Sequence, residues 1–150
     1  MLLCDLTPAH IEVAATLHQT SFDHAWTQKE FQGLLALPTT KGWISDDGLL
    51  LVSHVLDEIE ILTILIHPNE RRKGKAAFFL NHLIEYAKKN DVSCIFLEVN
   101  VNNFSAIKLY EKIGFVKMGV RKNYYKMNDG TFNDALLYRF SFNEEIFRSN

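Results

Sequence analysis

Two segments of this chain are apolar over almost their whole length, and they restrict the possible folds more than any other feature. Residues 59–66 are rich in β-branched side chains, and residues 92–99 are apolar apart from Ser93 and Glu98. Between them, apolar side chains recur at i, i+3, i+4, i+7, i+8 and i+11 from Ala76, the spacing of an amphipathic helix that runs to Lys89. Strands that are apolar on both faces are typical of buried parallel strands joined by a crossover helix. The sequence therefore predicts a βαβ unit.

Shorter patterns predict the remaining elements. Thr7-Pro8 and Thr27 with Glu30 are signals for helix starts, and Gly114 ends a helix over residues 104–112. Strands are expected at residues 2–6, 43–45, 49–56, 115–120 and 135–142, with Asp46-Asp47-Gly48 and Asp129-Gly130 in the connections. These connections favour antiparallel pairs. The expected fold class is a mixed α+β sheet, largely antiparallel, with one parallel βαβ pair and helices on both faces.

Size and composition restrict the class of protein. One domain spanning residues 1–150 is expected for a chain of 150 residues, of which 47% are hydrophobic. The net charge of −2 disfavours general nucleic-acid binding. No apolar run reaches the length of a membrane span, and the start, MLLCDLTP, lacks the basic region of a signal peptide. A cytoplasmic protein that binds neither nucleic acid nor membrane is therefore expected.

The cysteines and histidines form no metal-binding pattern. Cys4 and Cys94 are far apart and each has apolar neighbours, so we expect buried free thiols in a reducing compartment. The six histidines form no HExxH pattern, and none accompanies a cysteine pair at the spacing of a zinc site. We therefore expect no metal.

The segment RRKGKA, residues 71–76, links the first apolar strand to the predicted helix and gathers four cationic residues around Gly74. Unpaired N–H groups and the helix dipole attract anions to a helix start, and glycine lets the backbone approach them closely. Ligands of such sheets bind at the carboxyl ends of parallel strands, where this loop lies. Cations alone would oppose the dipole, so the segment favours a phosphate ligand over a solvated basic loop. It matches neither GxxxxGK[ST] nor GxGxxG.

Three motifs in order resemble those of the GNAT acetyltransferases. They are Arg71-Arg72-Lys73-Gly74-Lys75-Ala76, then Leu97-Glu98-Val99, then Asn103, Ala106, Leu109, Tyr110, Gly114 and Phe115 in the pattern NxxAxxLYxxxGF. RKNYY at residues 121–125, followed by Asp129-Gly130, makes the chain similar to the subfamily of bacterial ribosomal-protein alanine N-acetyltransferases. The resemblance covers residues 2–140 and is strongest over residues 58–125.

The resemblance implies a GNAT fold, acetyl-CoA as cosubstrate, and acetyl transfer to the N-terminal α-amine of a protein, with a ribosomal protein as the expected partner. It implies that backbone groups of Ile64, Leu65 and Ile66 pair with the pantetheine arm and that residues 71–76 hold the pyrophosphate. We expect Gly74, Ala76 and the helix start to make most of the contacts to the pyrophosphate. Smaller contributions are expected from Arg71, Arg72, Lys73 and Lys75. Glu98 matches the general base, Tyr110 the general acid, and Asn103 an asparagine that contacts the cofactor.

The chemistry of these side chains can also be judged without the resemblance. An α-amine with a pKa of about 8 is roughly one-tenth neutral at pH 7, so a modest base acting through water is adequate. Glu98 ends an otherwise apolar strand, where burial raises the pKa of a carboxyl group; alternatively, it is solvated or paired with a lysine. Tyr110 lies on the apolar stripe of its helix, so its hydroxyl needs a buried partner, either the CoA sulfur or a backbone group.

Other residues keep two interpretations. Asn103 suits both a helix N-cap and a cofactor contact. Tyr124-Tyr125 either lines a peptide channel or packs within a strand, and Trp26 and Trp43 are core or groove-lining residues. The chain also departs from the family pattern. Ala76 stands where a second glycine is commoner, and Ala25 precedes Trp26 where the subfamily usually has proline.

The identity of the acceptor stays open at this point. One alternative is a GNAT enzyme that acetylates a small amine, such as a polyamine, an amino acid or an antibiotic. Acidic residues around the acceptor would favour a polyamine, and an open channel would favour a peptide. A second alternative is a non-catalytic acyl-CoA-binding module, against which the presence of both Glu98 and Tyr110 counts. A monomer or weak dimer is expected.

Overall fold

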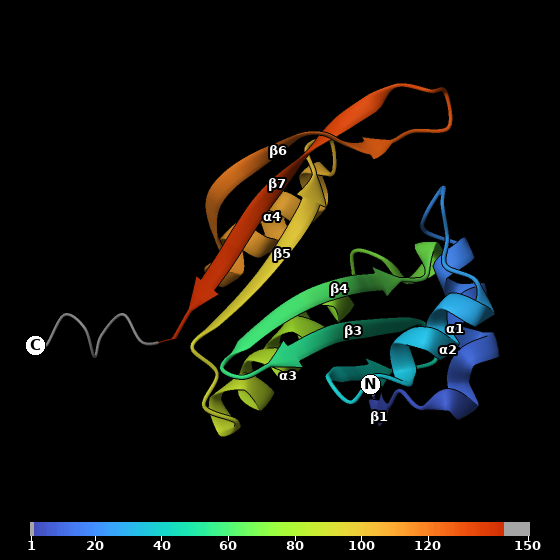
Figure 1. Ribbon diagram of the computed structural model, residues 1–150, viewed down its shortest axis with the longest axis vertical. Coiled ribbons are helices and arrows are strands. Elements are labelled where there is room, and N and C mark those ends of the chain that lie inside the picture. The colour runs from blue at the N-terminus through green and yellow to red at the C-terminus, as the bar shows by residue number, and fades with distance from the viewer. Residues whose placement is uncertain (1, 143–150) are drawn as a thin grey trace, which may run out of the picture. The chain divides into compact units, whose positions relative to one another are not determined.

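The computed structural model describes residues 2–142, and Met1 and residues 143–150 lie outside the described part. Its elements in chain order are β1 (Cys4–Asp5), a 3₁₀ turn (Pro8–His10), α1 (Ile11–Gln19), α2 (Gln28–Leu35), β2 (Thr40–Ile44), β3 (Gly48–Val55), β4 (Glu58–Ile66), a second 3₁₀ turn (Pro68–Glu70), α3 (Lys75–Lys89), β5 (Cys94–Asn100), α4 (Phe104–Ile113), β6 (Val116–Lys126) and β7 (Phe132–Ser141) (Figure 1). Every helix and strand predicted from the sequence is present, some with different bounds. No helix within residues 2–142 has the length and apolar character that crossing a membrane requires.

The strands form one seven-stranded sheet in the order β1-β2-β3-β4-β5-β7-β6. The β4–β5 pair is parallel, with Glu58 opposite Cys94 and Glu60 opposite Phe96. The pairs β1–β2, β2–β3, β5–β7 and β6–β7 are antiparallel. The predicted mixed sheet with one parallel βαβ pair is therefore confirmed.

The chain divides into two compact units. Unit 1 comprises Met1–Val55 and Ile61–Glu85, and unit 2 comprises Leu56–Glu60 and Tyr86–Asn150. The single domain predicted for residues 1–150 includes residues outside the described part and stays a prediction.

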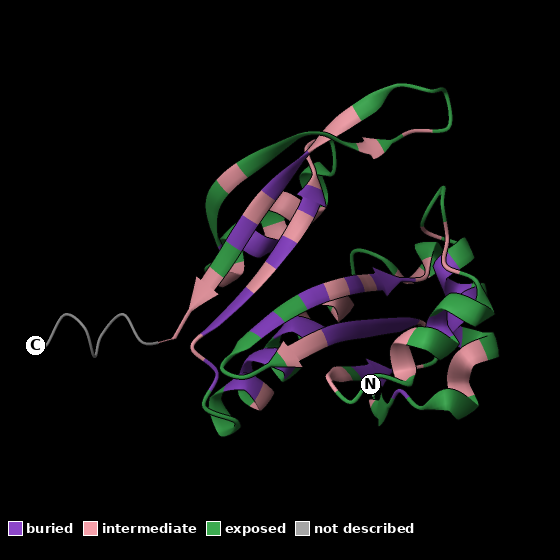
Figure 2. Ribbon diagram, viewed as in Figure 1, coloured by how far each residue is buried: buried purple, intermediate pink, exposed green. Residues whose placement is uncertain are grey.

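In unit 1, helices cover both faces of the strands. One face packs against α1 and α2, in a core that includes Ala14, Leu17, Phe31, Ile44, Leu49, Leu51 and Leu65. On the other face, the Trp43 ring contacts the His82 ring of α3 at a centroid distance of 5.2 Å. Because both faces are covered, β3 is buried along most of its length (Figure 2), which is why residues 49–52 form a continuous apolar run.

His18 of α1 is the buried polar centre of this core. It is 3% exposed and stacks between the Phe22 and Trp26 rings, at 4.3 and 4.7 Å. The backbone N–H of Trp26 donates to its Nδ1 at 2.9 Å, so Nε2 carries the proton and donates to Thr63 Oγ1 at 3.2 Å. Burial lowers the pKa of His18 to about 4. The ring is therefore neutral and fixes the segment between α1 and α2.

In unit 2, α4 covers one face of strands β5, β7 and β6. The Phe115 ring lies 5.5 Å from that of Phe140 on β7, and Tyr138 on the same strand donates to Glu111 Oε2 at 3.2 Å. Gly114 ends α4 with φ 125°, as predicted from the sequence. The alternating residues Phe96 and Glu98 therefore lie on the face of these strands opposite α4.

Several predicted bounds and burial states are wrong. β6 continues to Lys126 instead of ending at residue 120, so RKNYY lies within a strand and the connection that holds Asp129-Gly130 is short. Cys4 is exposed because β1 is only two residues long, at the start of the chain, whereas Cys94 is buried as expected. Both cysteines are free thiols.

Candidate active site

The loop of residues 71–76 lies between β4 and α3, within unit 1. Arg72 and Gly74 both have left-handed backbones, with φ 64° and 76°. A Cβ added to Gly74 would meet no atom within 4 Å. The first N–H groups of α3 have no partner within the helix. The loop therefore presents an open backbone surface at a helix start, a geometry that suits a phosphate group.

Three of the four cationic side chains of this loop have partners within the protein. Arg71 donates through Nε to the Ile66 carbonyl at 3.1 Å and through Nη2 to Ser21 Oγ at 2.9 Å. Lys73 and Lys75 lie 2.9 and 3.0 Å from Glu70 Oε2. These two bonds, Lys73 first, lower the pKa of Glu70 to about 2.

Lys75 also pairs with Asp47 in the β2–β3 turn. Internal carboxylates therefore supply the negative charge that the sequence assigned to a ligand. The cluster of cations does not by itself require a phosphate.

Ile64, Leu65 and Ile66 form the carboxyl-terminal part of β4, directly before this loop. Leu65 and Ile66 are buried and Ile64 is half-buried, so their side chains are fixed by packing. The Ile66 carbonyl is the acceptor for Arg71. The structure thus joins two of the predicted cofactor-binding segments, the end of β4 and the loop, through one hydrogen bond.

Glu98 lies on β5 in unit 2, with its side chain 21% exposed. Its Oε1 is 3.2 Å from Nη2 of Arg121, whose guanidinium also lies 5.1 Å from the centre of the Tyr124 ring. The charge of Glu98, then desolvation and a side-chain hydrogen bond to Glu98, raise the pKa of Tyr124. The sequence predicted an apolar surrounding or a lysine partner, but the structure places an arginine and a tyrosine beside this carboxylate.

Tyr110 lies on α4, in the same unit as Glu98, and is 6% exposed. Burial and, to a smaller extent, Tyr125 raise the pKa of the Tyr110 hydroxyl, so it stays protonated at neutral pH. Burial and the charge of Glu98 raise the pKa of Tyr125 to about 12. The charge of Glu98 therefore acts on the pKa of Tyr125, and Tyr125 in turn acts on the pKa of Tyr110.

Asn103 caps α4, because its Oδ1 accepts a hydrogen bond from the Ala106 N–H at 3.3 Å. The predicted N-cap is therefore confirmed, whereas the cofactor contact is not tested by this geometry. Among residues 2–142, no group of three or more His, Cys, Asp or Glu side chains is placed to hold a metal ion.

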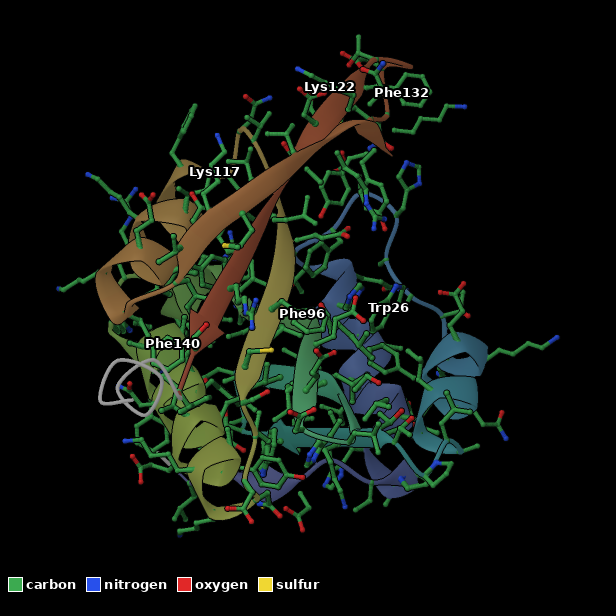
Figure 3. The ribbon with its side chains drawn as sticks, turned by 60° about the vertical axis from the view of Figure 1, so that its left-hand side comes forward. Trp26, Phe96, Lys117, Lys122, Phe132 and Phe140 are labelled. Atoms are coloured by element: carbon green, nitrogen blue, oxygen red, sulfur yellow. The ribbon has the colours of Figure 1, made fainter. Side chains whose placement is uncertain are left out.

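A cavity of about 410 Å³ opens on the face of unit 2 that carries Glu98. Its walls combine acidic, basic and apolar residues of β4, β5, β6 and β7: Glu58, Glu60, Cys94, Phe96, Leu97, Glu98, Met118, Arg121, Leu137, Tyr138 and Arg139. Figure 3 shows Phe96, which lies directly opposite Glu60 on the neighbouring strand. Arg121, Glu58 and Glu60 are absent from the predicted site residues. Glu58 and Glu60 could have been found from the sequence, because residues two apart in a strand lie on the same face. Arg121 could not, because only the pairing of β6 with β7 places it beside Glu98.

The sequence profile of the Acetyltransferase (GNAT) family matches residues 14–115. The chain belongs to the acetyltransferase (GNAT) family. A ribosomal protein bS18-alanine N-acetyltransferase of Salmonella typhimurium is 31% identical over 140 residues, or 88% of this chain and 91% of that protein. The crystal structure of the ribosomal-protein-S18-alanine N-acetyltransferase from Escherichia coli matches with a TM-score of 0.87 at 27% identity, over 93% of this chain and 92% of that chain.

Arabidopsis thaliana NAA60 in complex with acetyl-CoA has the same fold, with a TM-score of 0.81 at 19% identity over 95% of this chain and 99% of that chain. The predicted resemblance to GNAT acetyltransferases and the predicted fold are both confirmed. The profile match spans the loop of residues 71–76, Glu98 and Tyr110.

Proposed function

We propose that this protein transfers an acetyl group from acetyl-CoA to the N-terminal α-amine of a protein, and that the acceptor is a ribosomal protein that begins with alanine. The observation that carries the proposal is the 31% identity over 88% of the chain to a ribosomal protein bS18-alanine N-acetyltransferase. The carboxylate of Glu98 beside an open cavity is consistent with an acceptor as large as a peptide.

In unit 1, the end of β4 and the loop of residues 71–76 are the proposed cofactor contacts. The open backbone at Gly74 and the start of α3 would hold the diphosphate of acetyl-CoA, and Ile64, Leu65 and Ile66 would offer backbone groups to the pantetheine arm. Arg71, Arg72, Lys73, Lys75 and Ala76 complete the proposed cofactor contacts of this unit. Asn103, at the start of α4 in unit 2, is proposed as a cofactor contact from the resemblance alone. Because Lys73 and Lys75 already have carboxylate partners, their contribution is smaller than that of the backbone.

Unit 2 carries the side chains that we propose for the chemistry. Acetyl-CoA supplies an activated acetyl group as a thioester. The neutral amine forms the new N–C bond as the C–S bond breaks, and Glu98 takes the proton of the amine through a water molecule. Tyr110 holds the proton for the departing thiolate and then regains one from solvent. The raised pKa of Tyr110 keeps this hydroxyl protonated until the thiolate leaves.

The proposal extends to the setting of the enzyme. We propose one GNAT domain over residues 1–150, a monomer or weak dimer, working in the cytoplasm without a metal, a membrane or direct nucleic-acid contact. Size-exclusion chromatography with light scattering tests the oligomeric state, and activity in the presence of a chelator tests the metal.

A panel of acceptors tests the reaction. The protein is incubated with acetyl-CoA and peptides that differ only in the first residue, and thiol release is followed, with mass spectrometry locating the acetyl group. We expect turnover with the alanine peptide and acetylation at its α-amine. Activity on spermidine with none on any peptide would overturn the proposal.

One observation favours a second candidate, the acetylation of a small polycation. Glu58 and Glu60 line the same cavity as Glu98, and free carboxylates attract ammonium groups. Arg121 and Arg139 line it too and offset that charge. The acceptor panel therefore includes spermidine, and Glu60→Gln should weaken spermidine turnover selectively if this candidate is correct.

A further inference from the structure

Arg121 is bound to the carboxylate proposed as the catalytic base. Its Nη2 lies 3.2 Å from Glu98 Oε1, and its guanidinium rests 5.1 Å from the centre of the Tyr124 ring. The Arg121 side chain is 55% exposed and the Glu98 side chain 21% exposed, so the cation faces the solvent side of the carboxylate. Any acceptor that reaches Glu98 therefore meets a permanent positive charge, since arginine stays protonated at every working pH.

A one-residue irregularity in β6 places Arg121 on the face of Glu98. Lys117 pairs with Tyr138, but Gly119 pairs with Leu137, so β6 advances two residues while β7 advances one. Arg121 consequently pairs with Ala135, which lies on the same face as Leu137, the partner of Glu98. Without the extra residue Arg121 would point to the opposite face, because side chains alternate along a strand.

This placement addresses a difficulty of the proposed reaction. An amine attacks the thioester only when neutral, and a carboxylate close to an amine favours its protonated form. Unpaired, Glu98 would hold the acceptor as an unreactive ammonium ion. A nearby cation acts in the opposite direction and favours the neutral amine.

We propose that Arg121 is a charge-balancing and positioning residue: by pairing with Glu98 it prevents the acceptor from being held there as an ammonium ion, while it leaves the carboxylate able to take a proton through water. The proposal rests on the proposed function, because it takes Glu98 as the base.

Other charged or titratable groups surround Glu98 on every neighbouring strand. They are Glu58 and Glu60 on β4, Tyr124 and Tyr125 on β6 and Arg139 on β7, with Tyr110 on α4 next to Tyr125. The raised pKa values of the three tyrosines keep them neutral between pH 6 and pH 9. These tyrosines therefore do not contribute to changes of rate in this range, which report on the acceptor amine.

The test compares the pH dependence of peptide acetylation in two matched variants. Arg121→Gln should move the rise of kcat toward higher pH by about one unit, because a charge within ~4–6 Å shifts a titration by at least that much. At pH 7 kcat should fall about tenfold, the KM for the peptide should also fall, and at pH 9 most of the difference should disappear. Arg121→Lys should restore the wild-type profile. The affinity for acetyl-CoA should not change.

Lys122→Gln provides the control. Lys122 follows Arg121 directly on β6 (Figure 3), carries the same charge and pairs with Asp134 at 3.2 Å, with its side chain 81% exposed. This variant should leave the profile unchanged. With a peptide that begins with β-fluoroalanine, whose amine is less basic, the difference in kcat at pH 7 between wild type and Arg121→Gln should be smaller.

The outcomes separate the two proposals. A wild type that acetylates no peptide, or a Glu98→Gln variant with full activity, contradicts the proposed function. An active wild type whose Arg121→Gln variant loses kcat equally at all pH values, with unchanged KM, overturns the role of Arg121 alone. If Arg121→Gln proves unstable in thermal unfolding, wild type is compared with Arg121→Lys on the alanine peptide and the β-fluoroalanine peptide. A difference in kcat between these two proteins that changes with the basicity of the peptide amine contradicts the proposal.

Discussion

Gly74→Ala tests the role of the left-handed backbone in the loop of residues 71–76, because the variant leaves the charges of the loop unchanged. Gly74 has φ 76°, and a Cβ there would meet no atom within 4 Å, so the folded protein can accommodate alanine without a clash. The cost comes from the left-handed backbone, roughly 1–2 kcal/mol for a residue with a Cβ. Alanine also restricts the unfolded chain, which returns about 0.4–1 kcal/mol. The net loss should be about 1 kcal/mol.

Gly33→Ala is the matched control. Gly33 lies within α2, and a Cβ there also meets nothing within 4 Å, but its backbone is helical. Alanine should stabilise this position by about 0.5–1 kcal/mol. Thermal unfolding followed by circular dichroism should show a Tm lower by about 2–4 °C for Gly74→Ala and slightly higher for Gly33→Ala. Equal shifts in the two variants would show that the left-handed backbone carries no cost.

Two other variants, Gly74→Val and Lys73→Ala, address acetyl-CoA binding, measured by titration calorimetry. A valine side chain at residue 74 would occupy the open space through which the proposed diphosphate approaches, so Gly74→Val should weaken binding at least tenfold, about 1.4 kcal/mol. Lys73→Ala removes a side chain that is 57% exposed and pairs with Glu70. It should weaken binding only about two- to fourfold, because exposed charges contribute little. A larger loss for Lys73→Ala would refute the view that the backbone does most of the holding.

Three further outcomes follow from the structure. Glu98→Gln should lower kcat by about 10²-fold while acetyl-CoA affinity stays the same, as judged by steady-state kinetics and calorimetry; an unchanged kcat would remove Glu98 as base. Tyr110→Phe should lower kcat by a similar factor with little change of Tm, because the variant keeps the buried ring and removes only the hydroxyl; a Tm that drops by several degrees would point to a structural role. His18 has a pKa of about 4 when folded and 6.5 when unfolded, so the unfolded state binds more protons as the pH falls below 6.5 and stability decreases. Urea unfolding should show a loss of about 2 kcal/mol between pH 7 and pH 5 that is absent in His18→Leu; a loss of the same size in the variant would assign it to other groups.

The sequence pattern was sufficient to predict those helices and strands whose conformation depends only on their own residues. The apolar residues 59–66 and 92–99 fold as β4 and β5, and the helical spacing from Ala76 gives α3, because burial of those side chains alone selects the element. The glycine at residue 114 ends α4 for a similarly local reason, its positive φ.

Pairing between distant residues was not predictable. The strand expected at residues 115–120 stopped short of RKNYY, although packing within a strand was one of two interpretations of Tyr124-Tyr125. In the structure Tyr125 pairs with Asn133 and Lys126 with Phe132, so pairing with β7 extends the strand. The same limit applies to the site. The counter-charge of Lys75 comes from Asp47, 28 residues earlier, and the partner of Glu98 comes from another strand. The loop and the proposed base and acid were located from sequence motifs, but the charge partners of Lys75 and Glu98 depend on contacts with distant residues.

The irregularity that turns Arg121 toward Glu98 has a second effect, on self-association. β6 is the last strand in the sheet order, and it carries the exposed apolar side chains of Val116, Met118 and Val120. A long, regular, apolar edge would act as a template for strand addition by other chains. The two shifts in the β6–β7 register and the lysines along β6 break the regular edge that such growth needs. Restoring a regular strand would therefore move Arg121 away from the base and also favour aggregation at the same edge.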